Sequence, residues 1–191
     1  IGEITANLSF DDPRVTNLFD HAEACGMPVT FHVAIRDRNI YGLIDDLGLP
    51  RLEKQLAAHP GLVFFGHSQS FWANMSADIT EEEWGGYPKG PVVAGGRIPE
   101  LMRRYPNLYG DLSAGSGFNA VSRDPEFGYA FLNEFQDQLC FATDVCAPSG
   151  RQSVLIYLKQ FLEDGLGTGK LPQEAFDKIT HRNAQRVLKL A

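Results

Sequence analysis

The sequence predicts an α/β fold built on a parallel sheet, and two observations support this. Strand-like and helix-like segments alternate along the 191 residues, as they do in βα units. Three short apolar runs of strand length each end in a polar residue that can bind a metal: 28–32, 62–67 and 139–144, which end in His32, His67 and Asp144. The carboxyl ends of parallel strands share one edge, where barrel enzymes carry their chemistry, so we expect these side chains to converge. Two histidines and an aspartate suit a borderline cation such as zinc.

The first part of the sequence contains three expected strands and two expected helices. In chain order these are a strand over 1–4, a helix over 15–25, a strand over 28–32, a helix over 48–59 and a strand over 62–67. Both helices carry apolar residues at helical spacing. Asp12-Pro13 opens the first helix, and a glycine follows each of them, Gly26 and Gly61, where the chain can turn away.

The alternation resumes in the second half of the chain. The expected segments are a helix over 99–105, a strand over 108–112, a helix over 125–135, a strand over 139–144, and helices over 153–163 and 173–190. No linker or repeat is evident, so we expect a single domain over 1–191. Five strands fit either an incomplete barrel or an open doubly wound sheet, and the pattern alone does not separate the two.

Residues 68–97 interrupt this alternation with a long irregular connection. The segment holds the aromatic residues Phe71, Trp72, Trp84 and Tyr87 and five glycines. Long connections in compact domains are more often functional than idle, so we expect a lid or a substrate wall built from these aromatic side chains. A packed surface insertion is the alternative.

Composition and charge argue against several classes of function. The net charge of −7 and the lack of a basic run argue against nucleic-acid binding, and no apolar stretch approaches the roughly 18–20 residues that span a membrane. The three cysteines, Cys25, Cys140 and Cys146, lack the spacing of a metal site, which favours a reducing, cytoplasmic location. The sequence starts at Ile1 without an initiator methionine, so we expect it to begin inside a strand and to lack its natural start.

A series of short motifs runs along the whole chain. They are Gly2-Glu3-Ile4, Asp12-Pro13, Ala22-Glu23, Gly26-Met27-Pro28-Val29 with His32, Pro60, Gly66-His67, Tyr105-Pro106-Asn107-Leu108-Tyr109-Gly110-Asp111-Leu112-Ser113, Phe141-Ala142-Thr143-Asp144, and the tail Ile179-Thr180, Asn183-Ala184 and Arg186-Val187-Leu188. Each motif alone is modest. Their order and spacing together resemble the amidohydrolase-related metal-dependent hydrolases, a group that includes aminocarboxymuconate-semialdehyde decarboxylase and related decarboxylases.

The resemblance implies a TIM-like (β/α)8 barrel that is incomplete in this chain. Matched motif by motif, the chain would hold strands four to eight of the barrel and lack strands one to three. His32 would then end strand five, His67 strand six and Asp144 strand eight. The His-x-His motif that ends strand one in this family has no counterpart in the sequence.

The resemblance also implies roles for the polar residues at the strand ends. His32 would bind a divalent metal, zinc before manganese, and Asp144 would bind it and accept a proton from the bound water. His67 would act as a general acid or base, with metal contact as a further role. Glu3 would be a bridging ligand in a two-metal variant, and Asp111 with Ser113 would support the site through hydrogen bonds. Four arginines could bind a substrate carboxylate, although solvation at the surface is the default for each: Arg36, Arg38, Arg97 and Arg123.

The expected activity is hydrolysis of a small amide, ester or lactone by metal-activated water. Decarboxylation of a small unsaturated or aromatic acid is the close alternative, because the same scaffold and ligands support both. A non-catalytic barrel fragment is a third reading. Its open sheet edges, over 1–4 and 139–144, would pair with another chain and so favour a homo-oligomer.

A catalytic triad built on a serine is the alternative to a metal site. Gly66-His67-Ser68-Gln69-Ser70 is similar to a nucleophile elbow, and Ser68, Asp144 and His181 follow the chain order of the α/β-hydrolase triad. Against it, the final glycine of the elbow is replaced by Ser70, the sequence predicts a long irregular connection and not a helix after it, and His181 lies in an expected helix. We therefore rank this reading well below the metal site.

Overall fold

The computed structural model describes residues 1–38, 40–145 and 154–190, and within them five strands form one parallel sheet. The strand order is β2-β1-β3-β4-β5. The bounds are β1 (Val29–Ile35), β2 (Leu43–Asp45), β3 (Phe64–His67), β4 (Leu108–Asp111) and β5 (Leu139–Cys140). Every neighbouring pair is parallel, which confirms the predicted fold class.

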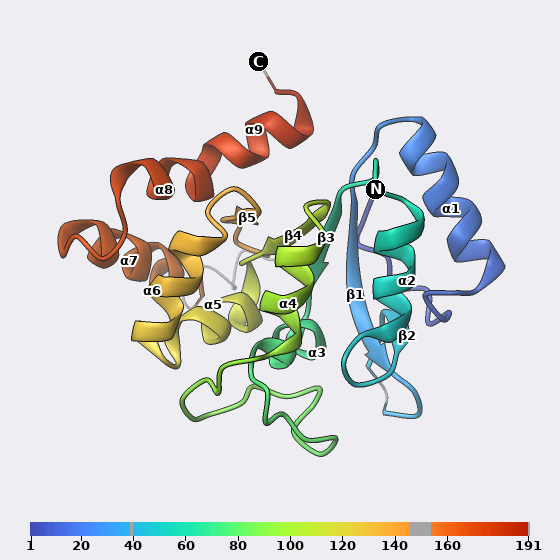
Figure 1. The fold of residues 1–191 in the computed structure, drawn as a ribbon, viewed down its shortest axis with the longest axis horizontal. Coiled ribbons are helices and arrows are strands. Elements are labelled where there is room, and N and C mark those ends of the chain that lie inside the picture. Colours follow the sequence, from blue (N-terminus) through green and yellow to red (C-terminus); the bar gives the residue numbers. More distant parts are fainter. Residues whose placement is uncertain (39, 146–153, 191) are drawn as a thin grey trace.

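The helices between the strands are mostly short. They are α1 (Pro13–Ala24), α2 (Pro50–Ala58), α3 (Gln69–Trp72), α4 (Arg97–Arg104), α5 (Ala114–Ser122), α6 (Pro125–Glu134), α7 (Val154–Gly167), α8 (Gln173–Asp177) and α9 (Asn183–Leu188), with a 3-10 turn η1 (Ala73–Met75) and a π-helical turn η3 (Lys178–Arg182). In Figure 1, α1 and α2 flank β1 and β2, while α5, α6 and α7 lie beyond β4 and β5. Asp12 starts α1 as expected, because its carboxylate accepts the N–H of Arg14 and Pro13 needs no partner.

The two faces of the sheet have different surroundings. Residues such as Phe31, Phe64 and Leu108 point to the helices and are fully buried in the main hydrophobic core. The alternate residues of the same strands point to the opposite face, because side chains alternate along a strand. On that face Phe65 and Tyr109 form a smaller cluster with Cys140, against which α9 packs Ala184 and Val187. This second face carries the candidate site, and we call it the site face.

The N-terminal segment differs from the prediction. Residues 1–4 do not form a strand; they run beside β1, where Ile4 makes an isolated parallel bridge to Phe31 and its N–H donates to the carbonyl of Thr30 at 2.9 Å. Further on, Ser9 bridges to Ile44 of β2. The sheet still has five strands, because β2 takes the place of the strand expected over 1–4. The sequence did not predict β2, because its three residues are too few to show a period.

The C-terminal half differs in three places. β5 ends at Cys140 rather than at 144, because the N–H of Phe141 turns to the carbonyl of Ile179 at 2.8 Å. The single helix expected over 173–190 is divided by the π-helical turn η3. Helix α5 was not expected, because two glycines in its nine residues weaken the helical signal. Cys146 and the start of the helix expected over 153–163 lie outside the described residues.

The connection over 68–97 is a packed insertion, so the prediction of an aromatic lid is wrong for most of its residues. Phe71, Trp72 and Trp84 are buried in the main core. The indole N–H of Trp72 donates to the carbonyl of Asp111 at 3.0 Å, and that of Trp84 donates to the carbonyl of Ser70 at 2.7 Å. Of the four aromatic residues, only Tyr87 is exposed. The connection lies at the end of the molecule toward which β1 points (Figure 1).

Candidate metal and acid–base site

Two of the predicted site residues lie side by side on the site face. His32 of β1 and His67 of β3 are paired in register, and their ring centroids are 5.8 Å apart. Both side chains are buried. The sheet pairing alone brings them together, because residues in register on neighbouring parallel strands project on the same side.

Asp111 and Ser113, at the end of β4, hold the imidazole of His67. Nδ1 of His67 lies 3.2 Å from Oδ2 of Asp111 and 3.2 Å from Oγ of Ser113. Asp111 is fixed in turn, because its Oδ1 accepts the backbone N–H of Ser113 at 2.8 Å. A carboxylate accepts and does not donate, so the Nδ1 proton belongs on His67 and Nε2 is the nitrogen left for chemistry. The expected supporting role of these two residues is consistent with these contacts.

The other ring nitrogen of His67 faces Glu3. Nε2 lies 4.0 Å from Oε1 of Glu3, which reaches the site from the segment beside β1. Burial lowers the pKa of His67, but the hydrogen bond and charge of Asp111, with Glu3 and Asp144, outweigh it and raise that pKa above its usual value. Burial raises the pKa of Glu3, with the charges of Asp144 and Asp111 acting in the same direction and His67 opposing them. The charges of three carboxylates thus act on one imidazole.

His32 offers a nitrogen without a partner. Its Nδ1 is buried and makes no hydrogen bond with any of the residues described. Burial, and then the neighbouring His67, lower the pKa of His32 to about 4, although the backbone of Tyr41 and of Val33 acts on the ring in the opposite direction. The ring of Tyr41 lies over it, with centroids 4.3 Å apart. A neutral imidazole with an unsatisfied buried nitrogen has the chemistry of a metal ligand.

Asp144 lies in a loop, although the sequence predicts that it ends a strand. It lies beyond the end of β5 with a left-handed backbone (φ 57°) and is exposed. Its charge nevertheless raises the pKa of both Glu3 and His67.

These donors fit a divalent cation by type, but they do not form a complete coordination sphere. Within residues 1–38, 40–145 and 154–190, no three His, Cys, Asp or Glu side chains are grouped so that they could hold a metal ion. The unpartnered nitrogen of His32 is the observation that favours a ligand here. The assignment of His32, His67, Asp144 and Glu3 as ligands stays a prediction.

The rival serine constellation has a structural explanation. Oγ of Ser68 accepts the N–H of Val33 and the N–H of Phe71, both at 3.1 Å, and the residue is buried. His181 lies in η3 and contacts the hydroxyl of Thr180. Among the described residues no hydrogen bond joins Ser68, Asp144 and His181. Ser68 therefore ties β3 to β1 and caps α3.

The four candidate arginines separate into two groups. Arg38 donates to the carbonyls of Glu81 and Trp84, and Arg97 pairs with Glu53 and Glu100, so both hold the fold together. The side chains of Arg36 and Arg123 make no hydrogen bond or ion pair within the part of the chain that the structure describes. Arg123 is partly buried, and burial lowers its pKa.

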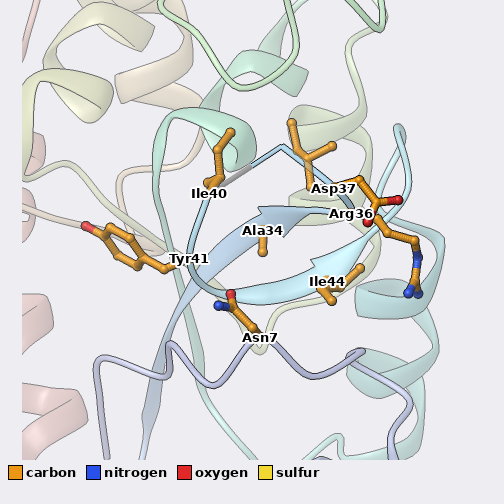
Figure 2. A pocket seen from close by; sticks show the side chains of 8 residues that line it. Asn7, Ala34, Arg36, Asp37, Ile40, Tyr41 and Ile44 are labelled. Carbon is orange, nitrogen blue, oxygen red and sulfur yellow. The ribbon is translucent and has the colours of Figure 1, made fainter.

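A cavity of about 320 Å³ lies at the end of β1, and Tyr41, whose ring lies over His32, forms part of its lining. It is lined by Asn7, Ala34, Ile35, Arg36, Asp37, Ile40, Tyr41 and Ile44 (Figure 2). Of these residues, sequence reasoning singled out only Arg36. The others were missed because the cavity forms where β2 pairs with β1, and the sequence carried no signal for β2.

The fold and these side chains define a parallel α/β chain with acid–base and metal-donor residues on one sheet face. The chain belongs to the amidohydrolase family, whose profile matches residues 6–190. This confirms the resemblance on which the incomplete barrel was predicted.

Solved structures support the barrel fold. The chain is similar to an uncharacterised TIM-barrel protein from Bordetella bronchiseptica (21% identity, TM-score 0.56, covering 95% of this chain and 52% of that one). It is also similar to an amidohydrolase from Burkholderia multivorans with bound zinc (12% identity, TM-score 0.59, covering 95% and 59%). A third similar structure is a dihydroxybenzoic acid decarboxylase from a Polaromonas species, with bound manganese and 2-nitroresorcinol (16% identity, TM-score 0.54, covering 95% and 55%).

This chain therefore spans between 52% and 59% of the length of these three structures. A comparison with curated proteins finds no match. Among the described helices, none has the length and apolar character needed to cross a membrane.

Proposed function

We propose that this chain carries the acid–base face of a metal-dependent hydrolase that acts on a small amide, ester or lactone. The observation that supports this most is the orientation of His67. Asp111 holds its Nδ1, and its Nε2 is directed toward Glu3 beside the unpartnered nitrogen of His32. An imidazole fixed in this way can move a proton at one defined atom.

In this proposal His32 and Asp144 would hold the cation, and Glu3 would add a further carboxylate. The relatives with zinc or manganese make a divalent ion the expected cofactor. Such an ion would polarise a substrate carbonyl and make a water more acidic. His67 exchanges a proton with the water or the leaving group at Nε2. Asp111 keeps the Nδ1 proton in place and stabilises the imidazolium when it forms.

Decarboxylation is the second candidate, and the same atom of His67 favours it. A proton held on Nε2 can also be delivered to a substrate carbon, which is the step that replaces the lost carboxylate. The similar structures include decarboxylases of dihydroxybenzoic acids. The substrate screen must therefore contain hydroxybenzoic acids as well as amides, esters and lactones.

The test combines metal content and turnover in matched variants. Zinc-loaded protein is dialysed and analysed by plasma mass spectrometry for the parent, His32→Asn, His67→Gly, Asp144→Asn and the exposed control His21→Asn. We expect close to one zinc per chain in the parent and control, and a loss in the His32 and Asp144 variants. In His67→Gly we expect zinc to remain and turnover to fall by about 10²–10⁴, with partial recovery on adding imidazole.

Other outcomes would contradict the proposal. Zinc retained by both His32→Asn and Asp144→Asn would remove these residues from the metal site. Turnover in His67→Gly equal to that of His21→Asn would remove His67 from the chemistry. A parent chain with neither zinc nor turnover would favour the non-catalytic fragment.

A further inference from the structure

The cavity beside His32 belongs to the same surface as the acid–base residues. Ala34 follows His32 by two positions along β1, so both side chains project onto the site face. Ile44 of β2 is the in-register partner of Ala34 and continues this surface. Tyr41 connects the two regions, because its ring lies over His32 and also lines the cavity. A molecule seated in the cavity would therefore extend toward His32.

The guanidinium group of Arg36 lies at one end of the cavity. Figure 2 shows Arg36 and Asp37 at one end, Tyr41 at the other, and Asn7, Ala34 and Ile44 between them. Arg36 is exposed, and its guanidinium has no carboxylate partner among the described residues. Most other arginines of the fold have such partners, as Arg51, Arg97, Arg103 and Arg182 do. Arg36 is thus available for a ligand.

The walls of the cavity combine apolar and hydrogen-bonding surface. Ala34, Ile40 and Ile44 contribute aliphatic groups. Asn7 is held in place by two hydrogen bonds to Gly42. Its side-chain Oδ1 accepts the backbone N–H of Gly42 at 3.1 Å, and its backbone N–H donates to the carbonyl of Gly42 at 2.8 Å. Its amide nitrogen can then donate to a ligand oxygen. The volume of about 320 Å³ is that of a small-molecule site.

From this arrangement we infer that the cavity binds the carboxylate-bearing end of the substrate, with Arg36 pairing with the carboxylate. A guanidinium binds a carboxylate through two parallel N–H···O bonds, which fixes orientation as well as affinity. The apolar body of the ligand would lie against Ala34 and Ile44, and its reacting group would extend past Tyr41 to His32 and His67. This last step rests on the proposed function, whereas carboxylate binding at Arg36 does not.

Asp37 makes the inference more specific. Its carboxylate lines the same end of the cavity, and a left-handed backbone (φ 64°) places it there. A simple carboxylate would be repelled by Asp37, so neutralising that residue should leave binding unchanged or strengthen it. A zwitterion with an ammonium group would instead need Asp37. The two ligand types therefore respond in opposite directions to the same substitution.

Calorimetric titration of the whole chain with benzoate, and with benzamide as its neutral isostere, tests the inference. We expect benzoate to bind more tightly than benzamide. Arg36→Gln should weaken benzoate binding about 10- to 100-fold and leave benzamide unchanged, and Arg36→Lys should weaken it less. Asp37→Asn should bind benzoate at least as well as the parent. Arg103→Gln, which removes the same charge at a distant exposed ion pair, is the control. Circular dichroism confirms that each variant is folded.

Three results would overturn the inference: benzoate binding no tighter than benzamide binding, equal benzoate affinity in Arg36→Gln and the parent, or loss of benzoate binding in Asp37→Asn. His67→Gly separates this outcome from the proposed function. It should bind benzoate like the parent although its turnover is lost. Turnover that survives in His67→Gly while Arg36→Gln loses benzoate would contradict the function and leave the cavity assignment standing.

Discussion

His32 and His67 are in-register partners on neighbouring parallel strands, with ring centroids 5.8 Å apart and ring planes at 58°. The site therefore depends on the register of β1 and β3. A shift of one residue in either strand would turn one imidazole into the hydrophobic core. Gly66 precedes His67, so a side chain at position 66 would point to the helix face. There the ring of Phe71 fills the space that this side chain would occupy.

We expect Gly66→Ala to disturb both stability and site. A Cβ at this position would lie 2.2 Å from Cζ of the buried Phe71, so the ring or the strand must move. Overpacking of this kind costs about 1–3 kcal/mol of unfolding free energy, measurable by urea denaturation. The control is Gly90→Ala, because no atom lies within 4 Å of its added Cβ. Equal stability of the two variants would show that β3 can move freely against Phe71.

Ser68 is expected to act in folding and not as a nucleophile. Ser68→Ala leaves two buried N–H groups, of Val33 and Phe71, without their acceptor. Each unsatisfied group costs about 1–3 kcal/mol, so the variant should unfold at clearly lower urea concentration. The folded variant should keep its turnover, and a fluorophosphonate should not label the parent at Ser68. Covalent labelling at that residue would revive the serine constellation.

The central part of the sheet was predictable from the sequence, and its edges were not. β1, β3 and β4 are apolar runs bounded by turns, and each was expected within three residues of its observed bounds. By contrast, 1–4 has the composition of a strand but forms one isolated bridge, and β2 has three residues. Pairing at an edge depends on long-range contacts, which a local pattern does not contain.

The residues of the candidate site also fall into those that the sequence could predict and those that it could not. His67 and Asp111 end their strands, so their position follows from the chain direction alone. His32 was expected to end its strand, but β1 continues to Ile35, and His32 joins the site because it is in register with His67. Tyr41 and Asn7 lie in connections, and their approach to His32 or the cavity depends on how β2 is placed. A sequence pattern can show which residues reach the carboxyl edge, but the residues that line the cavity require the tertiary structure.

Asp45 should be a strong determinant of stability. Its buried carboxylate accepts the N–H groups of Asp46, Arg51 and Leu52, and so caps α2, whose N-cap residue Leu49 has no side-chain acceptor. We expect Asp45→Ala to lower the free energy of unfolding by about 2–4 kcal/mol, measured by urea denaturation. The neighbouring Asp46→Ala removes only an exposed carboxylate that pairs with Arg51. It should lower the free energy of unfolding by less than about 1 kcal/mol. Similar losses in both variants would contradict the capping role.

Cys140 provides a prediction about pH. Burial, and then the charge of Asp111, raise the pKa of its thiol to about 12, although Arg186 opposes them. A raised thiol pKa keeps the neutral form, so at pH 8, about four units below, the reactive thiolate fraction is only about 10⁻⁴. We expect iodoacetamide to alkylate the exposed Cys25 in the native protein and to leave Cys140 unmodified, with peptide mass spectrometry reading each cysteine separately.

Two conditions control this experiment. Raising the pH toward 12 increases the thiolate fraction of Cys140, so labelling should rise there while the fold persists. In urea the burial is lost and the thiol returns to its ordinary pKa, so Cys140 should react at pH 8 as fast as Cys25. Because Cys140 packs with Phe65 and Tyr109 on the site face, its protection reports whether α9 stays packed over that face. Rapid alkylation of Cys140 at pH 8 in the native chain would mean that α9 opens and exposes the site face to solvent.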